Sequence, residues 1–378
     1  MAASKDTAII GGGLVGCLIG LSMADKDNKV VLIEKKKFNK ILSENFSPLS
    51  LTANTVDYLK TKKIWNPENL KNTPIYNLDI KLFNSFNTIK ISSDELEIPE
   101  LGQVVDKAAL LSHLRALCIN NKNIEIIDNI DVELDSNNSK IILNDKSSIK
   151  YKQLFITDGA NSKFIEQFNI HAKKISYNQT SFVLNCNYDT CENSAVQIFS
   201  KKGVFAVLPG HKKVKSIVAT INNKYINSYN FESTNFNESL LQKDLLPYVK
   251  DLHNTKLIYS HPLDTSRLDK WYIKNIIFLG NSSQLLHPFG AQGFNFSVDC
   301  IKKIDSVKTE LLSGDEFNNH VKTEIIKKRH SLFLGIDITS SLLMRDSFLG
   351  NVSSTFLGGF INNSSRIKKR FIKRILNI

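Results

Sequence analysis

"TAIIGGGLVGCLIGLSMADKDNKVVLIEKK", Thr7 to Lys36, is the most informative stretch of the chain. Its first residues, Thr7–Ile10, are apolar and partly β-branched, as in a short buried strand. Leu14–Met23 has the length of a helix and contains small and apolar residues, and a second buried strand closes on Glu34. Strand, glycine turn, helix and strand within about 30 residues predict a βαβ unit of a parallel sheet.

The glycines in this unit follow the pattern GxGxxG. We expect Gly11 to allow a tight turn, Gly13 to let a pyrophosphate approach the backbone, and Gly16 to let helix and strand pack closely. The N-terminus of the helix would favour the negative charge of a phosphate. Glu34 stands 18 residues after Gly16, where an acid accepts hydrogen bonds from an adenosine ribose and favours NAD or FAD over NADP. The alternative is a glycine turn that binds no ligand.

A second motif lies in "LFITDGANSKF", where an apolar strand ends at Asp158-Gly159. The carboxylate of Asp158 would stand at the tip of a turn and face the same ligand. A plain Asp-Gly turn is the other interpretation.

A third motif lies in "NIIFLGNSSQLLHPFGAQGFNFSVDC", residues 275–300. Gly280-Asn281 closes an apolar strand, and Gln292-Gly293 starts an amphipathic helix. Two helix N-termini would then face one cofactor, one toward its pyrophosphate and one toward another electron-rich group. NAD does not need the second helix. A flavin does, because its reduced ring carries negative charge that a helix N-terminus stabilises.

The three motifs in this order resemble the FAD-dependent aromatic hydroxylases of the para-hydroxybenzoate hydroxylase type. "GNSSQLLHPFGAQGFN" from Gly280 and "LGQVVDKAAL" from Leu101 are most similar to the ubiquinone-biosynthesis branch, which includes the 2-polyprenyl-6-methoxyphenol hydroxylases. "VLPG" at Val207 and "SHPLD" at Ser260 fall where the family has matching strand ends. The resemblance covers nearly the whole chain.

The resemblance implies an FAD that forms a C4a-hydroperoxide with O2 and hydroxylates the ring of a polyprenyl phenol in ubiquinone biosynthesis, with NAD(P)H as the expected electron donor. It places His287 and Pro288 beside the flavin, with His287 as a proton relay or as a structural residue that orders the loop. Ser47 replaces a usual arginine and Asn281 a usual aspartate. Two alternatives stay open. One is an oxidase or prenyl reductase of the same fold. The other, motivated by Ser47 and Asn281, is a non-catalytic subunit that assembles with other quinone-biosynthesis proteins.

The expected fold class is α/β, with a Rossmann-like FAD-binding domain interrupted by a mainly antiparallel β substrate domain and followed by a helical C-terminus. We assign residues 1–74, 100–180 and 265–330 to the FAD-binding domain, 75–99 and 181–264 to the substrate-binding sheet, and 331–378 to C-terminal helices. Within these limits, "VDKAALLSHLRALCI" from Val105 predicts an amphipathic helix. Helical patterns also cover 43–72 and 238–253.

Composition limits the remaining possibilities. The five cysteines are scattered and none has zinc spacing, so we expect reduced thiols in a cytosolic protein and no metal site. They are Cys17, Cys118, Cys186, Cys191 and Cys300. No apolar run is long enough to span a bilayer. Residues 8–24 imitate the apolar core of a secretory signal, but their five glycines argue against that interpretation.

The formal net charge is +12, and half of it comes from "RIKKRFIKRILNI", residues 366–378, which holds six basic residues and no acid. On a helix, Ile367, Phe371, Ile375 and Ile378 would share one face. This pattern predicts an interfacial helix on anionic lipid, and therefore a cytoplasmic protein that is peripheral on the inner face of the cell membrane. A helix docked on the protein itself is the alternative. Nucleic acid is not expected, because no basic platform with interleaved aromatic residues accompanies the tail.

Overall fold

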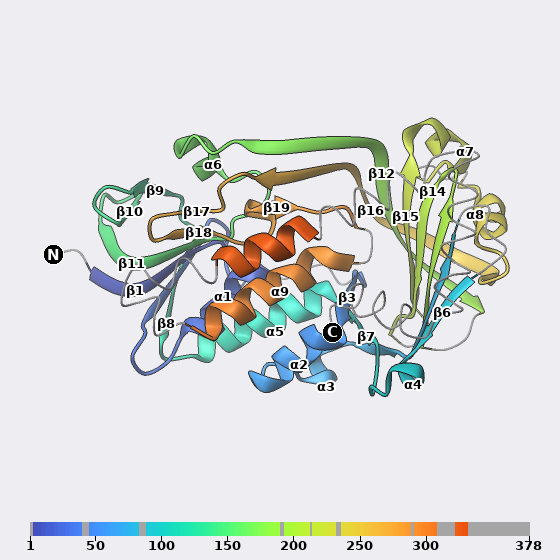
Figure 1. Cartoon of the computed structure of the whole chain (residues 1–378), viewed down its shortest axis with the longest axis horizontal. Coiled ribbons are helices and arrows are strands. Elements are labelled where there is room, and N and C mark those ends of the chain that lie inside the picture. Colours follow the sequence, from blue (N-terminus) through green and yellow to red (C-terminus); the bar gives the residue numbers. More distant parts are fainter. Residues whose placement is uncertain are drawn as a thin grey trace.

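The computed structural model describes residues 3–39, 45–82, 88–189, 193–211, 214–231, 236–288, 291–307 and 322–331. The strands form two sheets of eight strands and one of three (Figure 1). The described part is thus a mixed α/β structure, as the sequence predicts.

The first sheet carries the predicted βαβ unit. In spatial order its strands are β17 (Tyr272–Ile273), β18 (Ile276–Phe278), β11 (Ser148–Ile156), β1 (Ala3–Ile10), β2 (Val30–Glu34) and β8 (Ile124–Asp128), and β10 (Lys140–Leu143) and β9 (Val132–Asp135) extend from β11. The strands from β18 to β8 are parallel. Helix α1 (Leu14–Met23) has the predicted bounds.

Helices cover one face of this sheet. Helix α1 packs beside α5 (Lys107–Asn120) and α9 (Gln292–Asp305), and the three lie side by side in Figure 1. Together with a further helix, 322–331, they enclose one apolar core. The opposite face packs against β9, β10 and α6 (Lys163–Gln167) in a second core. Burial on both faces explains why the parallel strands are almost continuously apolar.

The second sheet is antiparallel except for one parallel pair, β13–β5. Its order is β19 (Gln284–Leu285), β16 (Lys250–Leu268), β12 (Ala172–Asp189), β15 (Lys215–Asn222), β14 (Gly203–Leu208), β13 (Ser194–Ser200), β5 (Asn77–Lys81) and β6 (Thr88–Ser92). Its outer face is covered by η1 (Asn223–Tyr225), α7 (Ile226–Tyr229) and α8 (Glu238–Leu245). The small third sheet is β3 (Pro48–Thr52), β7 (Gly102–Asp106) and β4 (Thr73–Ile75), with α2 (Ala53–Thr61), α3 (Pro67–Leu70) and α4 (Ser93–Leu96) nearby.

Two long strands join the parts. Strands β12 and β16 run from beside the first sheet into the second, as Figure 1 shows. The expected domain limits at 180 and 264 fall inside these strands, so the backbone crosses from one part to the other without a linker.

Two helix predictions are wrong in part. Residues 48–52, inside a stretch predicted as helical, form strand β3, because they pair with β7 rather than continuing α2. The helix predicted over 238–253 ends at Leu245, and residues from Lys250 onward form β16. In both cases a distant partner strand overrides the local pattern.

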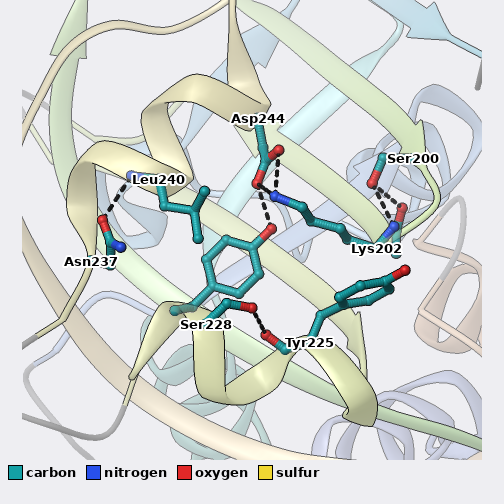
Figure 2. A network of polar contacts seen from close by, with 9 residues as sticks. Ser200, Lys202, Tyr225, Ser228, Asn237, Leu240 and Asp244 are labelled. Carbon is teal, nitrogen blue, oxygen red and sulfur yellow. Dashed lines mark hydrogen bonds and ion pairs between the residues drawn. The ribbon is translucent and has the colours of Figure 1, made fainter.

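A polar network fixes α8 to the second sheet. The hydroxyl of Tyr229 donates to Oδ2 of Asp244 at 2.5 Å, and Nζ of Lys202 donates to both carboxylate oxygens at 2.9 and 2.7 Å. Figure 2 shows Lys202 reaching Asp244 from the turn between β13 and β14. The side chain of Tyr229 is fully buried, so this network satisfies the one polar atom of a ring that anchors the outer core.

Candidate cofactor site

The predicted motifs meet at one edge of the parallel sheet. Glu34 ends β2, Gly11 follows β1, Asp158 follows β11 and Gly280 follows β18, and these four strands are neighbours. In open α/β sheets ligands bind at the carboxyl ends of the strands. The sequence motifs, although more than 100 residues apart, therefore build one site.

Two glycines shape the turn between β1 and α1. Gly11 has φ +108°, and a Cβ on it would stand 2.6 Å from the carbonyl of Thr157. A Cβ on Gly16 would stand 1.8 Å from the carbonyl oxygen of Gly11. Only glycine fits these two positions, because the neighbouring atoms are backbone and cannot move aside.

The start of α1 is open. The helix begins after Gly13 with no side-chain cap, and no other described heavy atom lies within 4 Å of the place a Cβ on Gly13 would take. Helix α9 begins in the same way: Ala291 offers no side-chain cap, and among the described residues none comes within 4 Å of the place a Cβ on Gly293 would take. By contrast α2, α5 and α8 are capped by Thr52, Asp106 and Asn237.

The starts of both helices come near Gly280. A Cβ on Gly280 would come within 3.0 Å of Val15, in the first turn of α1. Gly280 also borders a small cavity with Phe296 and Ser297, in the first two turns of α9. Backbone N–H groups of two helices therefore flank one edge, which is an arrangement suited to an extended anionic ligand.

Asn295, which sequence reasoning missed, anchors the start of α9. It is 1% exposed. Its Oδ1 accepts from the N–H of Thr52 at 3.0 Å, and its Nδ2 donates to the carbonyls of Ser50 at 2.9 Å and Ala291 at 2.7 Å. In the sequence, the signal that could have revealed Asn295 was its position as a polar residue within the apolar face of the predicted helix.

Arg115 is a second residue that the sequence did not reveal. From α5, its Nε donates to the carbonyl of Gly12 at 3.1 Å and its Nη1 to the carbonyl of Phe38 at 2.8 Å. The guanidinium also lies 4.9 Å from the centre of the Phe38 ring. Arg115 therefore supports the glycine turn through its hydrogen bonds. In the sequence, the signal for this role was weak: a single arginine on an otherwise apolar helix face.

Two carboxylates occupy the edge. Glu34 accepts the N–H of Gly12 at 2.5 Å and that of Lys36 at 3.0 Å. Asp158 remains accessible to solvent, yet protein atoms surround its carboxyl closely enough that desolvation raises its pKa to about 6. At neutral pH this carboxyl is mostly ionised and accepts hydrogen bonds, as from the hydroxyls of a sugar.

His287 lies beyond the turn that carries Gly280 and Asn281. Its side chain is 2% exposed, its Nε2 lies 3.3 Å from Oε1 of Gln179, and its ring packs edge-on against Tyr177. Burial lowers the pKa of His287 to about 4. The imidazole is therefore neutral at physiological pH. Asn281 and Pro288 are exposed, and Gly290 lies outside the described residues.

A separate cavity of about 530 Å³ opens beside the second sheet. Its lining includes Phe46, Asn185 and Lys256. None of the predicted cofactor residues borders it.

Within the described residues, no group of three or more His, Cys, Asp or Glu side chains could hold a metal ion. Four of the cysteines are buried free thiols, and Cys191 lies outside the described part. The described helices include none that is long and apolar enough to cross a membrane. The basic tail at 366–378 is also outside the described residues.

Known proteins were compared with the chain in sequence and in fold. No protein-family model matches the chain. The ubiquinone biosynthesis monooxygenase COQ6 of Dictyostelium discoideum is 23% identical over 456 residues, covering 97% of this chain and 90% of the relative. The 3-demethoxyubiquinol 3-hydroxylase of Escherichia coli is 22% identical over 377 residues, covering 95% and 90%.

Solved structures agree in fold. The p-nitrophenol 4-monooxygenase PnpA of Pseudomonas putida superposes with a TM-score of 0.77 at 13% identity, covering 100% of this chain and 99% of the other. PqsL of Pseudomonas aeruginosa, described as "a probable FAD-dependent monooxygenase", gives 0.76 at 13% identity, covering 93% and 99%. The resemblance and the fold class predicted from the sequence are thus confirmed. By sequence the chain is similar to ubiquinone-biosynthesis monooxygenases, and its fold is the one seen in these solved monooxygenase structures.

Proposed function

We propose that the chain is an FAD-dependent monooxygenase that hydroxylates the aromatic ring of a polyprenyl phenol in ubiquinone biosynthesis. The observation that carries the proposal is the similarity to ubiquinone-biosynthesis hydroxylases along nearly the whole chain. The open helix starts at Gly13 and Gly293 support it, because they leave room for a dinucleotide where the motifs require one.

The residues at the edge fit FAD in the following way. The N-terminus of α1 would bind the pyrophosphate, and Glu34 would accept hydrogen bonds from the adenosine ribose. The N-terminus of α9, held by Asn295, would lie against the electron-rich side of the flavin ring. FAD, when bound, supplies the redox chemistry that activates O2. NAD(P)H is the electron donor we propose.

Part of the inner face of the second sheet is apolar. Phe182, Leu184 and Cys186 of β12 belong to the outer core, so the alternate residues face the other way. Val183 pairs with Val218 of β15, and Val218 pairs with Ala206 of β14. Val218 and Ala206 are only half-buried, and such apolar side chains suit a prenylated ring better than a polar substrate.

His287 contributes by its protonation state. A neutral imidazole can accept a proton on one nitrogen while it donates from the other. Its burial beside Gln179 also keeps bulk water from this side of the turn. Exclusion of water is needed wherever an activated oxygen must react with a ring rather than decompose.

The experiment is reconstitution. The purified full chain is incubated with FAD, NADPH and a short-chain polyprenyl phenol, while O2 uptake is recorded and the product is identified by mass spectrometry. We expect O2 uptake that depends on the phenol and a product heavier by one oxygen atom. Flavin reduction without phenol-dependent O2 uptake would instead indicate an oxidase or prenyl reductase. Failure to take up FAD would indicate a non-catalytic subunit.

A further inference from the structure

Arg329 is a buried cation that the proposed chemistry does not use. It lies on the helix formed by residues 322–331 and is 7% exposed. Among the described residues no carboxylate forms an ion pair with it. Burying a guanidinium without an acid costs several kcal/mol unless good hydrogen bonds replace its water, so its three donor contacts indicate what it does.

All three acceptors belong to two adjoining segments. Nε of Arg329 donates to Oε1 of Gln284 at 2.9 Å, and Nη2 donates to the carbonyls of Leu268 at 3.1 Å and Ser283 at 3.5 Å. The guanidinium carbon lies 6.0 Å from the ring centre of Trp271. A planar fork that reaches three acceptors in fixed directions is a property of arginine that lysine lacks.

These segments form the back of the cofactor turn. Ser283 and Gln284 directly follow η2 (Gly280–Ser282), and Leu268 ends the long strand β16. The N–H of Leu268 donates to the carbonyl of Ser283 at 3.0 Å, so the two segments already touch. Arg329 adds hydrogen bonds to both segments, and it borders the same small cavity as Gly280.

The position of Gly280 depends on this junction. The turn is tight: the carbonyl of Gly280 accepts both the N–H and the hydroxyl of Ser283 at 3.0 Å. A shift of Ser283 therefore moves Gly280. A Cβ at Gly280 would stand only 3.0 Å from Val15. Gly280 therefore lies close to α1, and a small movement of Gly280 would change the space for a ligand.

We propose that Arg329 is a positioning residue for the cofactor, holding the turn from Gly280 to Gln284 in the conformation that presents Gly280 and Asn281 to FAD. The proposal rests on the proposed function, since it assumes FAD at this edge. It makes helix 322–331 part of the support of the cofactor site.

The test uses the full chain with Arg329→Met, which removes the donors, and Arg329→Lys, which keeps the charge but loses the fork. Lys327→Met is the matched control, because Lys327 is exposed on the same helix. FAD affinity is measured by titrating apoprotein into free flavin and following fluorescence quenching. Stability of each apoprotein is measured by urea unfolding.

We expect Arg329→Met to weaken FAD binding by about tenfold or more, Arg329→Lys to weaken it less, and Lys327→Met to stay within about twofold. A purely structural role would lower the stability of the apoprotein without this graded loss of affinity. If Arg329→Met does not fold, the double variant Gln284→Leu/Arg329→Met replaces the two hydrogen-bonded side chains by apolar ones and serves instead.

The two proposals fail in different ways. Wild-type protein that binds FAD while folded Arg329 variants bind it equally well would overturn the positioning role alone. Wild-type protein that binds no FAD would overturn the proposed function and, with it, this inference.

Discussion

The backbone N–H of Gly12 donates a 2.5 Å hydrogen bond to the carboxylate of Glu34, so the glycine turn is tied to the end of β2 without any ligand. An ionised carboxylate has about four acceptor positions. Glu34 uses two of them, for Gly12 and Lys36. It can therefore hold the turn and bind a ribose at the same time.

Glu34→Ala removes both functions, and Glu34→Gln keeps one acceptor oxygen for the turn. We expect FAD affinity to fall by about tenfold or more in the alanine variant and by less in the glutamine variant, since hydrogen bonds to charged groups contribute about 1.5–3 kcal/mol. Flavin fluorescence titration measures the change. Glu133→Ala, at an exposed position of β9, is the control. Equal affinities for Glu34→Ala and wild type would show that this carboxylate does not contact the cofactor.

Substitutions at Gly13 and Gly16 should have different effects, one on ligand binding and the other on folding. A Cβ on Gly16 would stand 1.8 Å from the carbonyl oxygen of Gly11, whereas one on Gly13 would enter open space. We expect Gly16→Ala to lower the free energy of unfolding of the apoprotein by about 3 kcal/mol. Gly13→Ala should change it by less than about 0.5 kcal/mol yet weaken FAD binding, because the methyl group occupies the approach to the backbone.

Urea unfolding of the two apoproteins and flavin titration of the Gly13 variant measure these effects. If Gly13→Ala binds FAD as tightly as the wild type, the pyrophosphate does not lie at the start of α1.

Local sequence patterns predicted the helices whose ends are marked by residues next to them in the sequence. The bounds of α1 followed from the glycines before it and the polar DKDN segment after it, and α9 began at the predicted Gln292. The gathering of Glu34, Asp158 and Gly280 at one edge was also implied, because consecutive parallel strands end on the same side.

The remaining features depend on distant partners. Strand β3 exists because β7 pairs with it, and β12 and β16 extend far beyond any local signal because they pair with each other. For the same reason sequence reasoning missed Arg115, Asn295 and Arg329. Each hydrogen-bonds to a residue at least 45 positions away in the sequence.

The basic tail gives a prediction from sequence alone. Deleting residues 366–378 removes six positive charges and lowers the formal net charge from +12 to +6. Each basic residue near an anionic membrane contributes about 1 kcal/mol. We expect the shortened chain to lose most of its sedimentation with phosphatidylserine vesicles at low salt. Neither the full chain nor the shortened chain should sediment with neutral phosphatidylcholine vesicles. Sedimentation that is unchanged by the deletion would exclude the tail as an anchor.

The lowered pKa of His287 predicts that the folded protein loses stability in acid. Its pKa is about 4 in the folded protein, because of burial, against an ordinary value of 6.5. Between these values the unfolded chain binds a proton that the folded chain does not. The contribution of His287 to stability is therefore complete above pH 6.5 and is lost as the pH falls toward 4, with a maximum loss of about 3 kcal/mol.

Comparing wild type with His287→Gln isolates this contribution, because other titrating groups such as Asp158 are common to both proteins. Glutamine is similar in size and can still hydrogen-bond to Gln179, but it does not titrate. Urea unfolding at intervals from pH 7.5 to 4.5 should show the free energy of unfolding falling more steeply for the wild type than for the variant below pH 6.5. Replacement of the exposed His261 by glutamine should leave the steep slope in place. Parallel slopes for wild type and His287→Gln would mean that the pKa of His287 is the same in the folded and the unfolded chain, and the lowered pKa of the buried imidazole would then have to be abandoned.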